Sequence, residues 1–187
     1  MTSRQERPLL RREGTTPAGE AWLVRPVRAD TDAAELLAIR DEVAAEGDLI
    51  AAMPGELSLL EENLALANLI AGGGLGLVAE VGGRIAGNLM VHRRRGRYEG
   101  HVGEVSIALR RDFRRLGLGR ALMETAVDWA RAVGVAKLTL GVFPDNAPAV
   151  GLYRAVGFVE EGVLRGQVRL PTGDSDLMVM GLVIQGR

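Results

Sequence analysis

The segment Val105-Ser-Ile-Ala-Leu-Arg-Arg-Asp-Phe-Arg-Arg-Leu-Gly-Leu-Gly-Arg-Ala-Leu-Met123 joins an apolar run, an arginine-rich turn, two glycines and the start of an amphipathic stripe. This pattern predicts a buried strand followed by a helix. The first amides of a helix lack intrahelical acceptors and carry about half a positive charge, which favours a phosphate there. Gly117 and Gly119 would let a diphosphate approach the backbone. Positive charge is added by Arg114, Arg115 and Arg120.

Two familiar phosphate-binding loops do not match this segment. A Walker loop requires a lysine after its last glycine, and Lys137 is the only lysine of the chain. A dinucleotide-binding loop requires a third glycine after the first strand, whereas Gly117-Leu-Gly-Arg-Ala-Leu122 has none and lies late in the chain. On these glycines alone, an ordinary strand-to-helix connection stays open as the other interpretation.

The flanking sequence predicts one domain over residues 21–187, preceded by a polar, aperiodic and flexible arm over residues 1–20. The expected order is β-αα-βββ-α-β-α-ββ, an α/β (α+β) fold with a mixed central sheet of about seven strands and helices on both faces. The expected strands are Trp22–Val27, Leu75–Val81, Arg84–His92, Val102–Leu109, Lys137–Phe143, 158–170 and 176–184. The expected helices cover about 32–46, 56–71, 117–133 and 146–156.

Composition narrows the classes of function. The chain of 187 residues is 47% hydrophobic and 25% charged, as soluble globular domains are. Its net charge of −1 gives no reason to expect a nucleic-acid partner. The lack of cysteine excludes disulfides and a cysteine nucleophile, and two histidines make a metal site difficult to build. We therefore expect no metal, no membrane segment or signal peptide, and a cytoplasmic location; a homodimer stays open.

A second segment, Pro144-Asp-Asn-Ala-Pro-Ala-Val-Gly-Leu-Tyr-Arg-Ala-Val-Gly-Phe158, follows the expected Lys137–Phe143 strand. Asn146 suits a helix N-cap, and Gly157 suits the end of that helix. Tyr153 falls about two turns into the helix. On this position alone, Tyr153 is interpreted equally well as a packed aromatic residue.

Together the two segments resemble the GNAT superfamily of acyl-CoA-dependent N-acyltransferases. The family's Arg/Gln-x-x-Gly-x-Gly/Ala signature corresponds to Arg114-Arg-Leu-Gly117-Leu-Gly119. Its Asn-x-x-Ala-x-x-Leu-Tyr-x-x-x-Gly-Phe segment corresponds to Asn146, Ala149, Leu152, Tyr153, Gly157 and Phe158. The element order and a closing acid-to-Met strand, Asp176 to Met180, also match, so the resemblance covers about residues 22–184.

The resemblance implies acetyl-CoA as the cosubstrate of an N-acetyltransferase, with its diphosphate on the amides of residues 115–120. The pantetheine arm would lie between two splayed strands, and Tyr153 would protonate the leaving thiolate. The implied cofactor-binding set is Ile107, Ala108, Leu109, Arg114, Arg115, Leu116, Gly117, Leu118, Gly119, Arg120, Asn146, Ala149 and Tyr153. Since there is no cysteine, the amine would attack directly within a ternary complex.

Glu104 is the candidate base that takes the proton of the attacking amine, because it lies on the strand beside the expected acyl group. A strand bulge would turn it to the other face, so a solvated or structural carboxylate is the other interpretation. The acceptor is expected to be a small-molecule amine or a peptide N-terminus. A cationic acceptor is favoured by seven acids without a basic residue, unless these are solvated helix faces: Asp41, Glu42, Glu46, Asp48, Glu56, Glu61 and Glu62.

Two other classes of function stay open at this point. One is a non-catalytic acyl-CoA-binding sensor, which would bind coenzyme A without turnover. The other is a small nucleotide-binding module, which would bind ATP or NAD instead.

Overall fold

The structure is a computed structural model and describes residues 10–47, 49–94 and 96–184. Eight strands and four α-helices are described, together with a short 3-10 turn at Arg111–Phe113. The strands are β1 (Arg12–Thr15), β2 (Ala21–Pro26), β3 (Leu75–Val81), β4 (Arg84–Arg93), β5 (Val102–Leu109), β6 (Lys137–Val142), β7 (Val159–Leu170) and β8 (Gly173–Val183). The helices are α1 (Ala33–Ala44), α2 (Leu59–Ala71), α3 (Leu118–Val133) and α4 (Ala147–Val156). The expected α/β architecture is confirmed.

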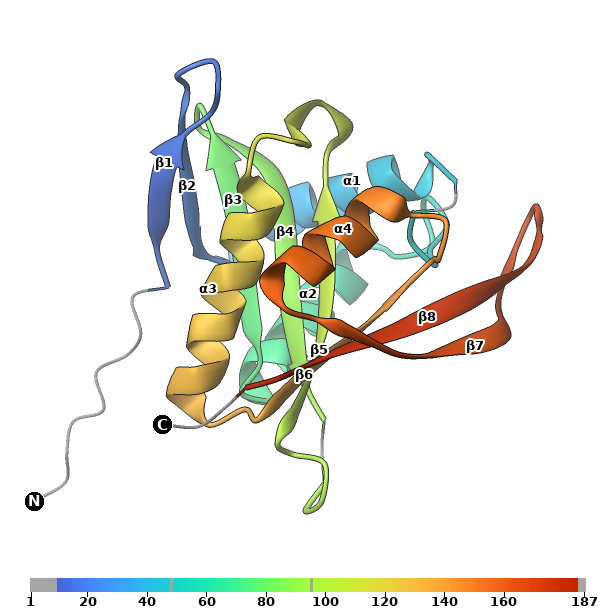
Figure 1. Cartoon of the computed structure of the whole chain (residues 1–187). Coiled ribbons are helices and arrows are strands. Elements are labelled where there is room, and N and C mark those ends of the chain that lie inside the picture. The colour runs from blue at the N-terminus through green and yellow to red at the C-terminus, as the bar shows by residue number, and fades with distance from the viewer. Residues whose placement is uncertain (1–9, 48, 95, 185–187) are drawn as a thin grey trace, which may run out of the picture.

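The strands form one sheet in the order β1-β2-β3-β4-β5-β6-β8-β7. Every neighbouring pair is antiparallel except β5 and β6, which are parallel. The parallel pair is possible because α3 returns the chain over the sheet between the two strands. Beyond this pair, β7 and β8 extend as a long hairpin away from the body of the domain (Figure 1).

Helices cover both faces of the sheet, as expected (Figure 1). One apolar core packs α3 and α4 against the sheet and includes Leu122, Ala126, Leu138 and Phe158. The second core, on the opposite face, packs α1 and α2 against Val78, Ile85 and Met90. The apolar stripe expected on α3 is accounted for, since ten of its sixteen residues are buried.

The expectation of a flexible arm up to residue 20 is wrong for the part that the structure describes. Arg12–Thr15 forms the edge strand β1, antiparallel to β2. Two features hold it there: the ring of Trp22 covers Gly14 so closely that a Cβ on Gly14 would overlap it, and Arg12 pairs with Glu124 and Asp128 of α3. The sheet therefore has one more strand than expected, while residues 1–9 lie outside the described residues.

The helix starts show why local signals locate some elements better than others. Ser58 caps α2 in a capping box, accepting from the Glu61 amide while Glu61 accepts from the Ser58 amide. At α1, the expected cap Asp32 makes no such bond. Its carboxylate binds the buried Arg25, at 2.7 Å, and the backbone amide of Arg28. Burial alone would raise the pKa of Asp32, and these hydrogen bonds lower it instead.

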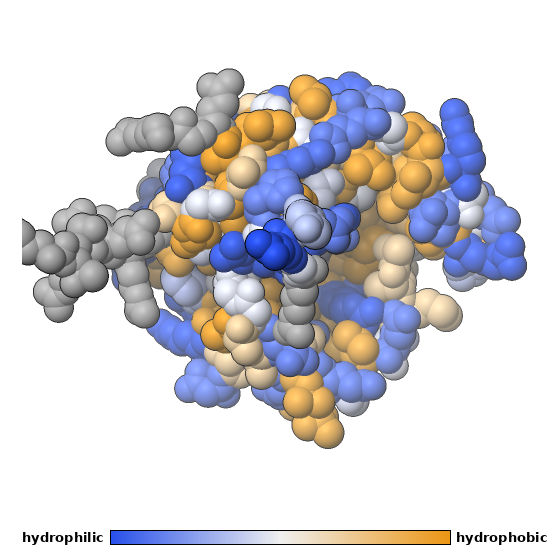
Figure 2. Space-filling model, turned by 90° about the horizontal axis from the view of Figure 1, so that it is seen from below, coloured by the Kyte–Doolittle hydropathy of each residue, from blue (hydrophilic) through white to orange (hydrophobic). Residues whose placement is uncertain are grey.

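The surface is mixed in character. Seen from below, hydrophobic and hydrophilic residues alternate over the face in view, and neither kind covers it alone (Figure 2). The exposed side of α2 contributes several apolar side chains, among them Leu60 and Leu64. None of the helices in the described ranges has the length and apolar character to cross a bilayer.

Candidate active site

The two parallel strands separate in the middle of the sheet. β5 and β6 are paired over three residue pairs only, from Val102 opposite Lys137 to Glu104 opposite Thr139. Beyond Glu104, β5 continues beside β4 and β6 continues beside β8, without further pairing between them in the described structure. The facing backbone groups of the two strands are therefore available to a ligand in the gap. α4 crosses in front of this region (Figure 1).

The loop between β5 and α3 presents backbone amides at the same end of the sheet. Arg115 has a φ of 63° and Gly117 a φ of 85°, both in the left-handed region. Left-handed residues in a turn can direct neighbouring backbone amides to one side, as in the nests that bind anions. Within the described chain, no acceptor is recorded for the backbone amides of residues 115–120. The first turn of α3 also has no acidic residue and no side-chain cap, so its positive end stays uncompensated.

The three arginines of this loop have different roles. Arg114 donates from Nε to the carbonyl oxygen of Leu109, at 2.9 Å, and its guanidinium pairs with Glu46. The hydrogen bonds that Glu46 accepts from Arg114 lower the pKa of the Glu46 carboxyl. Arg120 pairs with Glu124 one turn further along α3. Arg115 is exposed and has no ion pair among the described residues, so it is the arginine best placed to meet an anion.

The two glycines of the loop are required for different reasons. Gly117 has open space around it, and its positive φ explains the absence of a side chain. A Cβ on Gly119 would lie 3.0 Å from Leu152 and 3.2 Å from Leu109. Gly119 therefore allows α3 to approach α4 and β5 closely, rather than leaving room for a diphosphate as expected, although its amide still belongs to the loop.

Tyr153 lies in the core between α4 and the sheet, with 7% of its surface exposed. Its ring centroid is 6.2 Å from that of Phe158. Burial raises the pKa of Tyr153 to about 12. Its hydroxyl makes no hydrogen bond to the described residues. The hydroxyl oxygen is nevertheless not fully enclosed by the protein. The phenol is thus held by its ring while its oxygen reaches accessible space.

A hydrogen bond joins Asn146 and Ala149 at the start of α4. The Asn146 side-chain oxygen accepts a hydrogen bond of 3.2 Å from the Ala149 amide. This is the N-cap expected for Asn146, and it fixes the helix that carries Tyr153.

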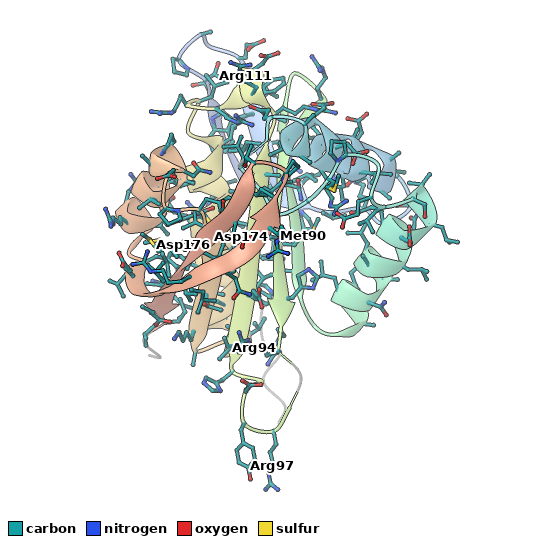
Figure 3. The ribbon with its side chains drawn as sticks, turned by 90° about the vertical axis from the view of Figure 1, so that its right-hand side faces the viewer. Met90, Arg94, Arg97, Arg111, Asp174 and Asp176 are labelled. Carbon is teal, nitrogen blue, oxygen red and sulfur yellow. The ribbon has the colours of Figure 1, made fainter. Side chains whose placement is uncertain are left out.

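A cavity of about 380 Å³ lies on the other face of the sheet, between α1, α2 and strands β4 and β5. Ile107 and Ala108 border it, as do Asn88, His92 and Ser106. Ile107 also approaches Gly119 on the α3 side, so the cavity reaches the strand whose other face meets the start of α3. Figure 3 looks onto this side, with Met90 on the sheet between the β7–β8 hairpin and α2. The volume is within the range of small-molecule sites.

Glu104 lies next to this cavity without bordering it. It is exposed on β5 and stands opposite His92 of β4 in the sheet register. Residues at every second position share a face, so Glu104 lies on the same face as Ser106 and Ala108, which border the cavity. The register between β4 and β5 is continuous and has no bulge. The one-residue slip that would turn Glu104 to the other face of the sheet therefore does not occur.

Most carboxylates of the acid-rich segment, residues 41–62, bind partners within the chain. Glu42 pairs with Arg110, Glu46 with Arg114 and Glu56 with Arg40. Asp41 accepts from the Gly55 amide, and Glu61 serves the capping box of α2. Asp48 lies outside the described residues. Glu62 alone of the acids in the described part of this segment borders the cavity, so a cationic acceptor loses most of its support.

Sequence reasoning missed Arg40, Asn88 and His92 as cavity residues. The last two alternate with Met90 on β4, and this period of two in polar residues on an otherwise apolar strand was a usable signal. No signal in the sequence pointed to Arg40, because Arg40 comes to the cavity only through the packing of α1 against α2. No group of three or more potential metal ligands was found among the described residues.

Comparisons with known proteins agree with this geometry. Residues 38–158 match the family model described as Acetyltransferase (GNAT) family. A solved structure of an acetyltransferase of the GNAT family from Streptococcus pneumoniae is similar to the chain at a TM-score of 0.80. The two share 30% sequence identity, over 88% of this chain and 99% of that chain.

Curated relatives match over shorter segments. A ribosomal protein bS18 alanine N-acetyltransferase of Escherichia coli is 40% identical over 79 residues, which are 42% of this chain and 53% of that protein. An L-amino acid N-acetyltransferase of the same species is 32% identical over 90 residues, 46% of this chain and 54% of that protein. The chain thus spans about half the length of the curated relatives that it matches.

Proposed function

The chain belongs to the GNAT family of acetyltransferases, and from this premise we propose that it transfers the acetyl group of acetyl-CoA to a primary amine. The observation that carries the proposal is the uncompensated nest of amides at residues 115–120, at the end of the sheet where β5 and β6 separate. An anion site and an adjacent strip of unpaired backbone fit one elongated ligand that has a diphosphate and an amide-containing arm.

The residues present fit acetyl-CoA. The amides of residues 115–120 would hold the diphosphate, with Arg115 beside them and Arg114 keeping the loop closed on Leu109. The backbone of Ile107, Ala108 and Leu109 would pair with the pantetheine arm in the gap. Bound in this way, acetyl-CoA supplies an acyl group activated as a thioester.

Tyr153 is the proposed general acid. A phenol whose pKa burial raises to about 12 stays protonated at neutral pH and can donate to the departing thiolate sulfur. The contact with Phe158 and the Asn146 cap fix the position of its helix and ring, so little reorganisation is needed during the reaction.

The amine would enter from the cavity on the α1 and α2 side. It must lose a proton before it attacks, because a protonated amine has no lone pair. Glu104 and His92 stand opposite each other at the edge of that cavity, and we assign proton acceptance to Glu104, acting directly or through a water molecule. The amine nitrogen then attacks the thioester carbon, the C–S bond breaks, and Tyr153 donates its phenolic proton to the sulfur. The nitrogen loses its second proton as the amide forms, and this proton, passed through water, restores the phenol.

A single-turnover assay tests this function. The purified protein is mixed with limiting radiolabelled acetyl-CoA and a panel of amines that contains amino acids, polyamines and short peptides. We expect label to move from coenzyme A to at least one amine, with release of the free thiol. Saturable binding of acetyl-CoA without transfer to any amine of a broad panel would favour the sensor function instead, and binding of ATP or NAD in its place would contradict both.

A further inference from the structure

The loop between β4 and β5, residues 93–101, concentrates positive charge and has no part in the proposed reaction; we call it the arginine loop. It contains Arg93, Arg94, Arg95 and Arg97, with Glu99 as its one acid, whereas the whole chain has a net charge of −1. Arg95 lies outside the described residues. The loop projects beyond the ends of the two strands, with Arg97 near its tip (Figures 1 and 3). The charge of the whole chain therefore conceals a local cationic surface.

Two arginines of this loop are available to a ligand. Arg93 is not one of them, because its Nη2 donates to the carbonyl oxygen of Gly100 at 3.0 Å and so shapes the loop. Arg94 contacts Glu99 at 3.3 Å, in a pair whose side chains are 46% and 61% exposed. An exposed pair of this kind contributes little stability, so another carboxylate can take the place of Glu99. Arg97 is exposed and forms no side-chain hydrogen bond or ion pair in the part of the chain that the structure describes.

An exposed aromatic ring accompanies these charges. Tyr98 is 85% exposed, more than any other large hydrophobic side chain in the described ranges. Tyrosine and arginine are enriched where proteins bind each other, because both combine a large contact area with hydrogen-bonding groups. The composition of the arginine loop is thus typical of a surface that contacts another polypeptide.

The arginine loop lies at the open end of the cavity. The Arg94 amide donates to the carbonyl oxygen of Val102 at 3.0 Å, so the pairing of the two strands continues one residue beyond β4. Residues at every second position share a face, which places Arg94 on the cavity face with Met90 and His92. Met90 is buried and His92 is exposed, so the cavity opens toward the loop.

The separation of the loop from the proposed reaction centre fits a polypeptide acceptor. Strand residues rise about 3.4 Å each, so Arg94 lies about 7 Å along β4 from His92, which stands opposite Glu104. An extended chain with its amine beside Glu104 would reach Arg94 with its third or fourth residue and Arg97 a few residues later. A free amino acid in the cavity would not reach the loop.

We propose that the arginine loop binds an acidic segment of a polypeptide acceptor whose N-terminal residue occupies the cavity. The inference rests on the proposed acetyl transfer and specifies its acceptor, an N-terminus followed within about six residues by acids. Arg94 and Arg97 would pair with the carboxylates, and Tyr98 would pack against the chain. A nucleic acid fits less well, because its phosphates require a cationic surface wider than one loop, and Glu104 is exposed on the neighbouring strand.

Three matched peptides test the charge preference. They share their first three residues, chosen from an accepted peptide, and carry Glu, Gln or Lys at the fourth to sixth positions. Rates are expressed per concentration of free amine, because the added charges change the pKa of the amine. We expect kcat/KM to be about tenfold higher for the Glu peptide than for the Gln peptide at low salt, mainly through KM, and lowest for the Lys peptide. Salt at about 1 M should remove the difference, since exposed charges are screened. Equal values at low salt, or the highest value for the Lys peptide, would overturn the inference.

Variants locate the effect. Arg94→Gln/Arg97→Gln should bring the ratio of the Glu to the Gln peptide close to one, and Arg94→Glu/Arg97→Glu should make the Lys peptide the best acceptor. Arg11→Gln/Arg131→Gln removes the same charge from two exposed arginines outside the loop, so it should keep the wild-type ratio. Melting temperature and acetyl-CoA affinity show whether each variant is folded. A ratio that survives in folded Arg94→Gln/Arg97→Gln protein would exclude the arginine loop.

Binding of unreactive peptides separates this inference from the proposed function. In these analogues a hydrogen replaces the N-terminal amine, and their Kd is measured on the protein loaded with coenzyme A. Acetylation of peptides without any charge preference in rate or Kd contradicts the arginine loop alone. Preferential binding of the Glu analogue through Arg94 and Arg97, with no amine acetylated, contradicts the proposed function instead. Binding of a short oligouridylate through the same two arginines, without a preference among the peptides, would assign the loop to a nucleic acid and overturn the inference.

Discussion

The Nε of Arg114 donates a hydrogen bond of 2.9 Å to the carbonyl oxygen of Leu109, and the same guanidinium pairs with Glu46 of the α1–α2 connection. The first arginine of the loop signature therefore ties the loop to the end of β5. In the proposed site, contact with the diphosphate is therefore assigned to the backbone amides, to Arg115 and to the positive end of α3. Affinity for coenzyme A is thus expected to depend on charge in the first turn of α3.

Charge reversal at Arg120 tests this dependence. Arg120 is exposed in the first turn of α3, and a glutamate there would repel a diphosphate on the neighbouring amides. We expect Arg120→Glu to weaken acetyl-CoA binding roughly tenfold, from the usual size of helix-end charge effects. Calorimetric titration measures the Kd. Arg131→Glu, in the last turn of the same helix, is the control and should bind normally; equal affinity of both variants would place the anion elsewhere.

Tyr153→Phe tests the proposed acid. The change removes one oxygen and keeps the ring that packs near Phe158, so acetyl-CoA affinity should change little. Loss of a general acid lowers the rate by about 10²–10⁴. Single-turnover rates are the right measure, because product release can hide the chemical step. A Phe variant that transfers acetyl at the wild-type rate would remove Tyr153 from the chemistry.

The same residue predicts how stability depends on alkaline pH. Burial raises the pKa of Tyr153 to about 12, above the ordinary value of about 10 for an unfolded chain. The folded state then binds the phenolic proton more tightly than the unfolded state does. The contribution of this proton to the free energy of unfolding is complete below pH 10 and is lost as the pH rises to about 12. Two pKa units correspond to about 2.7 kcal/mol.

Urea unfolding of wild type and Tyr153→Phe at pH values between about 9 and 12 measures this difference. The wild-type free energy of unfolding should fall by about 2–3 kcal/mol more than that of the variant over this interval. Parallel curves for the two proteins would mean that the phenol is not buried as described.

Deletion of residues 1–18 tests the edge strand. It removes the β1–β2 pairing and the Arg12 ion pairs, and it uncovers Trp22. Exposure of a large aromatic side chain costs about 1.5–3 kcal/mol, so we expect Tm to fall by about 5–10 °C. Thermal melting followed by circular dichroism provides the value. An unchanged Tm would show that β1 contributes nothing to the folded domain.

The loop and the elements around it could be predicted because their signals are local. Gly117, the arginines beside it and the apolar stripe of α3 lie within one run of residues, and so does the Asn146 cap of α4. β1 could not be predicted, because Arg12–Thr15 is short and charged and is held by Trp22 and by α3. Arg40 reaches the cavity only through long-range packing.

Glu104 shows the same division between local and long-range information. Its strand could be predicted from an apolar run, whereas its face depends on the register with β4, which pairs it with His92. The acid-rich segment was misleading for the reason that its arginine partners are distant in sequence, as in the 68-residue separation of Glu42 and Arg110. Charge balance in a folded chain cannot be inferred from one segment alone.

Amide chemical shifts of the isotope-labelled protein during a titration with acetyl-CoA test the central claim most directly. We predict saturable shifts for the backbone amides of residues 115–120 and of Ile107–Leu109, with one common Kd. The amides of the β7–β8 hairpin should keep their positions. Saturable binding that leaves residues 115–120 unchanged, or no binding at all, would contradict the assignment of this loop as the acetyl-CoA site.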